Sequence, residues 1–141
     1  MNTPRSAGRR RLAGFTLVEC AIACAIAGLL AATALPSLQA QQLRTARIDA
    51  VAALARVQAE QEKHRGLHGL YAHDLAALRG VSAASPQGRY TLVLTNTGAD
   101  SYRATASAIG VQQADSACPT LTLEVTSGFP RHGPTAACWN R

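Results

Sequence analysis

The residue with the most unusual surroundings is a single carboxylate, Glu19, near the start of an apolar run that begins at Gly14. No other strongly polar side chain occurs from Phe15 to Leu38. An ionised carboxylate in hydrocarbon either costs several kcal/mol of free energy or becomes protonated. Glu19 is therefore expensive to bury unless something compensates its charge.

Three residues have the spacing of metal ligands on a helix, namely Glu60, His64 and His68 at i, i+4 and i+8. Gly66 is expected to interrupt that helix, and no remote fourth ligand follows. A solvated helix end is therefore the favoured interpretation, and His73 and His132 have no ligand spacing at all. We predict no metal site.

A search for nucleophilic chemistry finds only Ser82, in "GVSAA", which lacks the second glycine of a nucleophile elbow. No glycine-rich phosphate loop is present in the sequence. Because no nucleophile, base and oxyanion donors occur together, we predict that the chain is not an enzyme and needs no cofactor.

The four cysteines form two pairs with different surroundings. Cys20 and Cys24 lie one helical turn apart in the apolar run, where a disulfide between them would unwind the helix. Small packing residues are favoured there over a bridge between subunits or a soft-metal site. Cys118 and Cys138 bracket a loop of about 21 residues, and a bridge there would stabilise a small exported domain by about 3 kcal/mol.

The net charge of +6 is concentrated at the N-terminus, where four arginines (Arg5, Arg9, Arg10 and Arg11) precede every acidic residue. The rest of the chain carries only +2. Basic residues before an apolar segment keep that end in the cytoplasm, so this charge is a topological signal rather than a DNA contact.

The C-terminal region carries four more arginines, Arg89, Arg103, Arg131 and Arg141. This number is within ordinary surface content, so a basic patch there remains an open alternative. The single tryptophan, Trp139, follows Cys138 directly. Packing over the bridge and sheet is favoured for Trp139 over an exposed adhesive or base-stacking contact.

The elements that position these residues begin with a helix predicted from about Phe15 to about Arg65, roughly 75 Å at 1.5 Å per residue. Residues 15–38 are apolar enough to span a membrane, and Pro36 predicts a kink rather than a stop. Residues 39–66 are amphipathic. Their apolar positions are Leu43, Ala46, Ala50, Leu54 and Val57, with Arg44, Arg47, Asp49, Arg56, Glu60 and Lys63 expected mostly on the solvated side.

Residues 67–141 are predicted to form a small head domain. A loop with one helical turn around Asp74 to Leu78 leads to two strands within residues 89–110, joined by a polar turn, and "TLTLEVT" supplies a third strand. Three antiparallel strands cannot bury their apolar face alone, so the amphipathic half of the helix is the expected partner. The fold class predicted is α+β.

The basic leader, then Gly14, Phe15 and the residues through Glu19, then an apolar run with Pro36, resemble the class III signal of type IV pilins. The long helix, sheet and cysteine-bounded tail ending in "CW" resemble the rest of a pilin, most closely the PilE-like pilins. The resemblance implies that residues 1–14 are a leader, cut by a prepilin peptidase between Gly14 and Phe15, and that the new Phe15 amino group is methylated. It also implies that Glu19 pairs with the terminal ammonium of a neighbouring subunit.

The resemblance thus implies a structural subunit, held in the inner membrane with its N-terminus in the cytoplasm and then assembled into an extracellular filament. Its partners would be other pilins, the prepilin peptidase, membrane lipid and the assembly machinery. The filament would support adhesion, motility or DNA uptake. Three alternatives stay open: a type II secretion pseudopilin, a minor pilin acting as a DNA-uptake receptor, and simple secretion with cleavage near Ala40.

Overall fold

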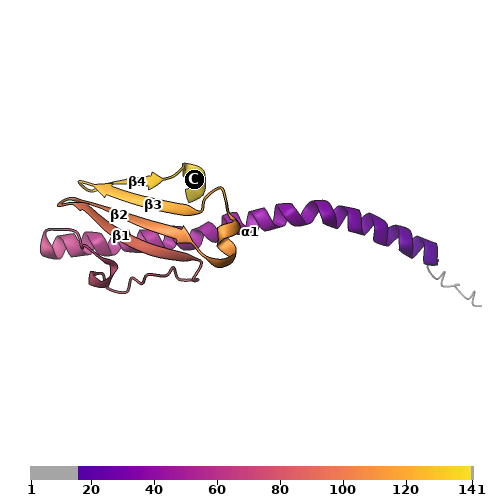
Figure 1. The fold of residues 1–141 in the computed structure, drawn as a ribbon, viewed down its shortest axis with the longest axis horizontal. Helices are drawn as coiled ribbons and strands as arrows, with labels where there is room; N and C mark the ends of the chain where they lie inside the picture. Colours follow the sequence, from indigo (N-terminus) through magenta and orange to yellow (C-terminus); the bar gives the residue numbers. More distant parts are fainter. Residues whose placement is uncertain (1–15, 141) are drawn as a thin grey trace, which may run out of the picture. The chain divides into compact units, whose positions relative to one another are not determined.

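The computed structural model describes residues 16–140. One long helix, α1 (Leu17–His68), is followed by an antiparallel sheet and a disulfide-bounded tail (Figure 1). The helix contributes to two compact units, one ending at Ser37 and the other beginning at Leu38. The predicted α+β class is confirmed.

In the first unit, α1 is long and apolar enough to cross a membrane. Its large side chains are exposed to the surroundings: Leu17, Val18, Ile22, Ile26, Leu29, Leu30 and Leu35. The helical assignment continues through position 36, and the kink predicted there stays a prediction. A surface this apolar requires lipid or other protein around it.

In the second unit, α1 buries the apolar face that the sequence predicts. Ala46, Ala50, Leu54 and Val57 are all at most 5% exposed, at spacings of three and four. The helix ends at His68, one turn later than expected, because Gly66 is accommodated inside it. Gly69 ends the helix with φ of +76° and an N–H donating to the Arg65 carbonyl at 2.8 Å.

The sheet has four antiparallel strands in the order β1 (Tyr90–Gly98), β2 (Ser101–Ala108), β3 (Thr120–Thr126) and β4 (Phe129–Gly133). The three predicted strands are confirmed, but β4 was not predicted. Ser127 and Gly128 both have positive φ, which forms a two-residue turn between β3 and β4.

Alternate residues of the strands pack on α1 and form one core. The core residues of the sheet are Tyr90, Leu92, Tyr102, Ala104, Ala106, Leu121, Leu123 and Val125. The opposite face of the sheet carries mostly threonine and serine. The sheet therefore buries only the face that the helix covers, as predicted.

Three short 3₁₀ helices complete the head: η1 (Leu75–Ala77), η2 (Gly110–Ala114) and η3 (Ala136–Trp139). Asp74 caps η1 by accepting the Ala77 N–H at 2.9 Å, which confirms the predicted helical turn. Cys118 and Cys138 form a disulfide that ties η3 to the chain just before β3.

Candidate functional site

The membrane-proximal residues predicted for processing and assembly are only partly described. Gly14 and Phe15 lie outside the described residues. Glu19 is exposed in the first turn of α1, and its carboxylate forms no hydrogen bond or ion pair within residues 16–140. Within this part of one chain, Glu19 therefore has no compensating charge.

The cysteines separate as the sequence predicts. Cys20 and Cys24 are unbridged and exposed on α1, whereas Cys118 and Cys138 are joined. Trp139 is buried beside that bridge, where its Nε1–H donates to the Gly133 carbonyl at 2.8 Å. The packing interpretation of Trp139 is confirmed, since a buried indole is not an adhesive surface.

A buried ion pair fixes η2 to the helix. Arg47 donates from Nε to Asp115 Oδ2 at 2.6 Å and from Nη2 to Oδ1 at 2.7 Å, while its Nη1 donates to the Ala137 carbonyl. Arg47 is 4% exposed and Asp115 5%. The expectation that Arg47 and Asp49 lie on the solvated side is wrong, because the head supplies polar partners that cover both.

The electrostatics of this pair follow from its geometry. The two hydrogen bonds from Arg47 hold the pKa of Asp115 below its usual value, against the opposing effect of burial. The same contact raises the pKa of Arg47. Both groups are therefore charged at neutral pH, and each satisfies the other in an interior that would penalise either alone.

The loop between α1 and β1, residues 69–89, is held on α1 near both of its ends. At its start, the amide of Gln61 pairs with the backbone of Ala72, accepting its N–H at 2.8 Å and donating to its carbonyl at 3.1 Å. At its end, buried Asp49 accepts from the Ser85 hydroxyl at 2.5 Å and from Gln87 N–H at 3.0 Å. The loop is thus positioned by α1 itself.

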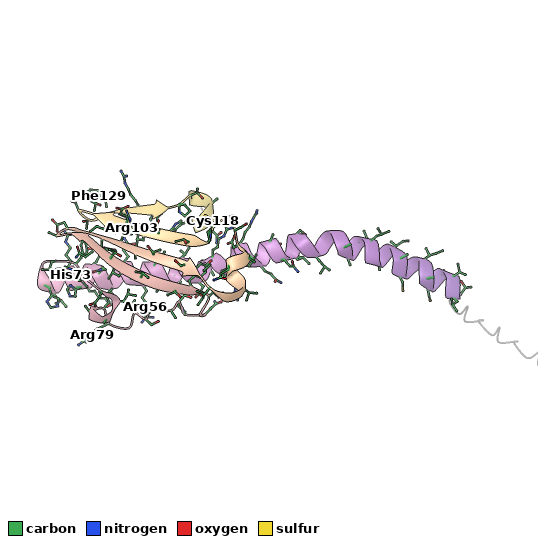
Figure 2. The ribbon with its side chains drawn as sticks, viewed as in Figure 1. Arg56, His73, Arg79, Arg103, Cys118 and Phe129 are labelled. Atoms are coloured by element: carbon green, nitrogen blue, oxygen red, sulfur yellow. A yellow bond between two sulfur atoms is a disulfide. The ribbon has the colours of Figure 1, made fainter. Side chains whose placement is uncertain are left out.

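Two arginines lie on the outside of this arrangement, on either side of Gly80. Arg56, on α1, and Arg79, after η1, are both labelled on the loop side of the head in Figure 2. A β-carbon placed at Gly80 would lie 2.9 Å from Arg56 Nη2, so the Arg56 guanidinium lies directly over the residue that follows Arg79. Neither side chain forms a hydrogen bond or ion pair with any other residue among 16–140. They form a cationic site without a counter-ion.

A cavity of about 580 Å³ adjoins Arg79 at the end of α1. It is lined by Glu60, Lys63, His64, Leu67, His68, Ala77, Leu78 and Arg79. The His64 and His68 rings are 4.3 Å apart, and Glu60 pairs with Lys63 at 2.5 Å. Because the helix continues through Gly66, the two histidines do share one face, contrary to the expected interruption. No cluster of three or more metal-ligating side chains forms in the described part of the chain.

We call Arg56, Lys63, His64, His68 and Arg79 together the loop face. All five belong to the end of α1 or to the segment that returns along it. Four of the five line the cavity and the fifth lies over Gly80. Such a set of donors, with Glu60 as the one carboxylate in the cavity lining, suits a ligand with several negative charges.

The four arginines considered from sequence as a possible patch behave differently. Arg103 pairs with Glu124 at 3.1 Å, and Arg131 lies opposite Glu124 in the register of β3 and β4. Arg89 lies just before β1, and Arg141 is outside the described residues. On the outer face of the sheet, Arg103 is therefore paired locally, and Glu124 is the carboxylate next to both arginines. Ser82, the nucleophile candidate, is occupied in a local turn with Ala84.

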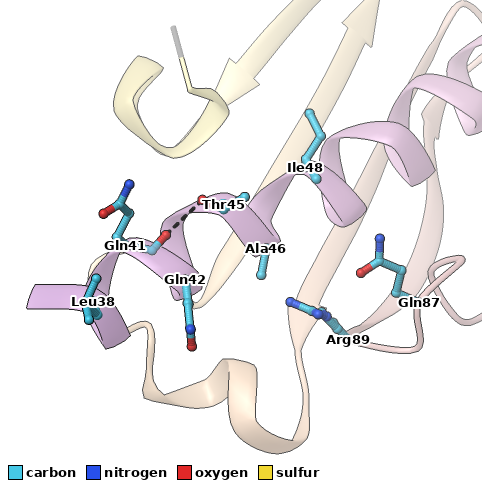
Figure 3. Close-up of a pocket in the computed structure, with 8 residues that line it drawn as sticks. All are labelled: Leu38, Gln41, Gln42, Thr45, Ala46, Ile48, Gln87 and Arg89. Carbon is cyan, nitrogen blue, oxygen red and sulfur yellow. Dashed lines mark hydrogen bonds between the residues drawn. The ribbon is translucent and has the colours of Figure 1, made fainter. Parts of the chain in front are cut away.

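Arg89 instead lines a groove beside an earlier part of α1. Figure 3 shows it facing the helix from below, with Leu38, Gln41, Gln42, Thr45, Ala46, Ile48 and Gln87. Thr45 donates its hydroxyl to the Gln41 carbonyl at 3.0 Å. The groove has a volume of about 570 Å³ and offers mostly amide groups and aliphatic side chains.

Sequence reasoning missed the loop face because its members are separated in the chain. Arg56 was assigned to the solvated side of the helix, which is correct, but nothing local indicates that Arg79 returns beside it. The signal that was available in the sequence is Gly80, because a glycine is typical of a tight turn. In the structure Gly80 has a positive φ, and the side chain of another residue lies over this turn.

One long helix on an antiparallel sheet, with a disulfide-bounded C-terminal tail, defines the type IV pilin class. Comparison with family models agrees: residues 9–35 match the prokaryotic N-terminal methylation motif, and residues 36–122 match the model described as "Type IV minor pilin ComP, DNA uptake sequence receptor". The second match covers more than half of the chain, so the chain belongs to the ComP family of type IV minor pilins. No curated protein matches the sequence.

The chain is therefore a type IV pilin subunit. Its methylation motif and its apolar N-terminal helix indicate anchoring in a membrane before assembly into a pilus. Families of this kind have structural roles. The resemblance to type IV pilins is confirmed, and within them the family that matches is that of the minor pilin ComP, whereas the sequence had suggested PilE-like pilins.

Proposed function

We propose that this pilin subunit is a DNA receptor that binds the phosphate backbone of duplex DNA through its loop face. The observation that carries the proposal is that Arg56, whose guanidinium lies over Gly80, and Arg79, the residue before Gly80, both have no counter-ion in the described chain. Unpaired cationic side chains on one surface attract a polyanion. The family description names a DNA uptake sequence receptor, and this supports the same assignment.

The arginines of the loop face are also held rigidly, which favours the binding of such a ligand. Arg56 is carried by α1, and Arg79 lies in the loop fixed on α1 by Gln61 and Asp49. Arginine binds phosphate with a rigid fork of donors, so rigid positioning increases affinity. Arg103, on the sheet, is already paired with Glu124 and is a weaker candidate.

The test measures binding of the full-length chain, in an uncharged detergent, to a fluorescent duplex of arbitrary sequence over a range of salt concentrations. Neutralising one phosphate contributes a slope of about −0.9 to log K against log salt. Arg56→Ala and Arg79→Ala should each weaken binding and make this slope less steep by about 0.9. Arg103→Ala, in the Glu124 pair, is the matched control and should change neither. Equal losses in all three variants would contradict a specific loop face.

For the membrane-proximal end, we infer that the leader is residues 1–14, that cleavage falls between Gly14 and Phe15, and that Phe15 is then methylated. Residues 15–38 anchor the subunit with the N-terminus in the cytoplasm, and Pro36 bends the helix. The class III signal supports this inference. Mass spectrometry of the mature N-terminus decides it, because a chain that begins near Gln41 would lack the anchor.

A further inference from the structure

The cavity beside Arg79 contains a pair of histidines that the binding of a phosphate backbone by two arginines does not require. His64 and His68 are one helical turn apart with ring centroids 4.3 Å from each other. Histidine is the side chain that gains a positive charge as pH falls from neutral towards mildly acidic values. The pair therefore gives one wall of the cavity a charge that depends on protons.

The hydrogen bonding of His64 determines which nitrogen takes up the proton. Nδ1 lies 3.0 Å from the Leu70 carbonyl oxygen. A carbonyl only accepts, so Nδ1 carries hydrogen in the neutral ring and Nε2 has the free lone pair. Protonation therefore occurs at Nε2 and creates a second N–H donor on a ring that the Leu70 carbonyl already orients.

The charged groups that face the pair come from α1 and from the opposite wall of the cavity. On α1, Lys63 lines the same cavity, and Glu60 is paired with Lys63. On the opposite wall, Arg79 lines the cavity. Asp74, at the start of η1, accepts a hydrogen bond from the Ala77 N–H. A second imidazolium would also face the first at short range. Glu60 is the only carboxylate in the lining, so cations outnumber anions there.

We propose that this cavity is a phosphate-binding site in which His64 and His68, when protonated, donate hydrogen bonds to a phosphodiester of bound DNA. The inference rests on the proposed DNA-binding function and adds to it a site, two ligands and a proton linkage. No covalent step occurs: the phosphodiester stays an anion, and one or two protons move from solvent to imidazole nitrogens. Because linkage is reciprocal, acid strengthens DNA binding, and DNA binding draws protons onto the protein.

The experiment measures DNA affinity of the full-length chain in uncharged detergent at constant ionic strength, between about pH 8 and about pH 6, where histidine changes charge. Each linked proton strengthens binding by up to about tenfold per pH unit. Titration calorimetry in two buffers of different ionisation enthalpy counts the same protons directly. Inorganic phosphate should compete with the duplex more strongly than chloride of equal ionic strength.

The test variant is His64→Gln with His68→Gln, which retains polar side chains but cannot be protonated. It should lose the pH dependence and the proton uptake, so that its affinity for DNA is the same near pH 6 and near pH 8. His68→Gln alone, at an exposed position, is a milder second variant that should lose part of both. His73→Gln, outside the cavity lining, is the matched control and should behave as the wild-type chain does.

The outcomes separate this inference from the function on which it rests. DNA binding with the same affinity at both ends of the pH range would overturn the histidine site and leave the DNA receptor intact. Retained pH dependence in the double variant would also overturn it, because the protons would then bind elsewhere. Absence of DNA binding at every pH would overturn both proposals.

Discussion

At the scale of single residues, the buried contact between Arg47 and Asp115 joins the head to the helix. Asp115→Ala should lower the free energy of unfolding of the head by about 3 to 5 kcal/mol, because it leaves the Arg47 guanidinium buried without a counter-ion. Denaturant unfolding of the full chain in detergent, followed by the fluorescence of Trp139, measures the loss. Trp139 is the only tryptophan and packs near Arg47's third partner, Ala137.

The matched control for that variant is Glu124→Ala. Glu124 belongs to an exposed pair with Arg103, and such pairs contribute at most about 1 kcal/mol. An Asp115→Ala chain that unfolds with the same free energy as Glu124→Ala would mean that the buried ion pair does not hold η2 on the helix.

The same pair predicts how head stability responds to acid. The pKa of Asp115 is lower in the folded head than in the unfolded chain, where it is about 3.9. A depressed folded pKa gives stability that is complete above the unfolded pKa and is lost as pH falls through the folded one. The unfolding free energies of wild type and Asp115→Asn should therefore differ most above about pH 5 and converge as pH falls below about 4. A constant difference would contradict this assignment.

At the scale of elements, the disulfide between Cys118 and Cys138 closes a segment that contains β3, β4 and most of η3. Cys118→Ser with Cys138→Ser should lower the unfolding free energy by about 3 kcal/mol, because the unfolded chain is no longer restricted by a loop of this length. Cys20→Ser with Cys24→Ser is the control and should leave the head unchanged. Peptide mapping without reductant checks that only the first pair is bridged.

How far the elements can be predicted depends on whether their signal is local. The helix and strands β1 to β3 follow from periodic apolar residues such as Leu54, Val57 and Leu121. Strand β4 contains Pro130 and a glycine and is too short to have a clear pattern, although the Ser127–Gly128 turn before it was a usable signal. The helix end was misplaced because Gly66 was assumed to break the helix, whereas α1 continues to His68, and its residues His64 and Arg65 contact Leu70 and Tyr71 of the following segment.

The candidate site was harder to predict than the fold, because its parts come together only in three dimensions. Arg47 and Asp49 appear on a helical wheel as solvated charges, and only the head reveals their partners Asp115 and Ser85. The loop face likewise joins Arg56 to Arg79 across a segment without regular spacing. In contrast, the class III signal is a contiguous motif and could be identified directly.

At the scale of the whole molecule, assembly is expected to depend on Glu19. Glu19→Ala should leave leader cleavage and membrane insertion intact but reduce incorporation into filaments. The variant would strand the Phe15 ammonium of the incoming subunit in an apolar core, where an unpaired charge costs about 3 to 5 kcal/mol. The measurement compares the variant in membranes and in sheared pili with wild type, in cells where it is the only copy. Equal incorporation would contradict the charge pairing.

The attachment of the 69–89 loop at both of its ends has a mechanical consequence. A taut ligand held at Arg79 exerts a force on this loop, and the loop passes that force into α1 through Gln61 at one end and Asp49 at the other. The two attachments share the load with β1, because Ser85 and Ala83 of the loop also form hydrogen bonds with Tyr90 and Leu92. Traction on the ligand is therefore transmitted to the helix, which is the element that continues towards the membrane-proximal end of the chain.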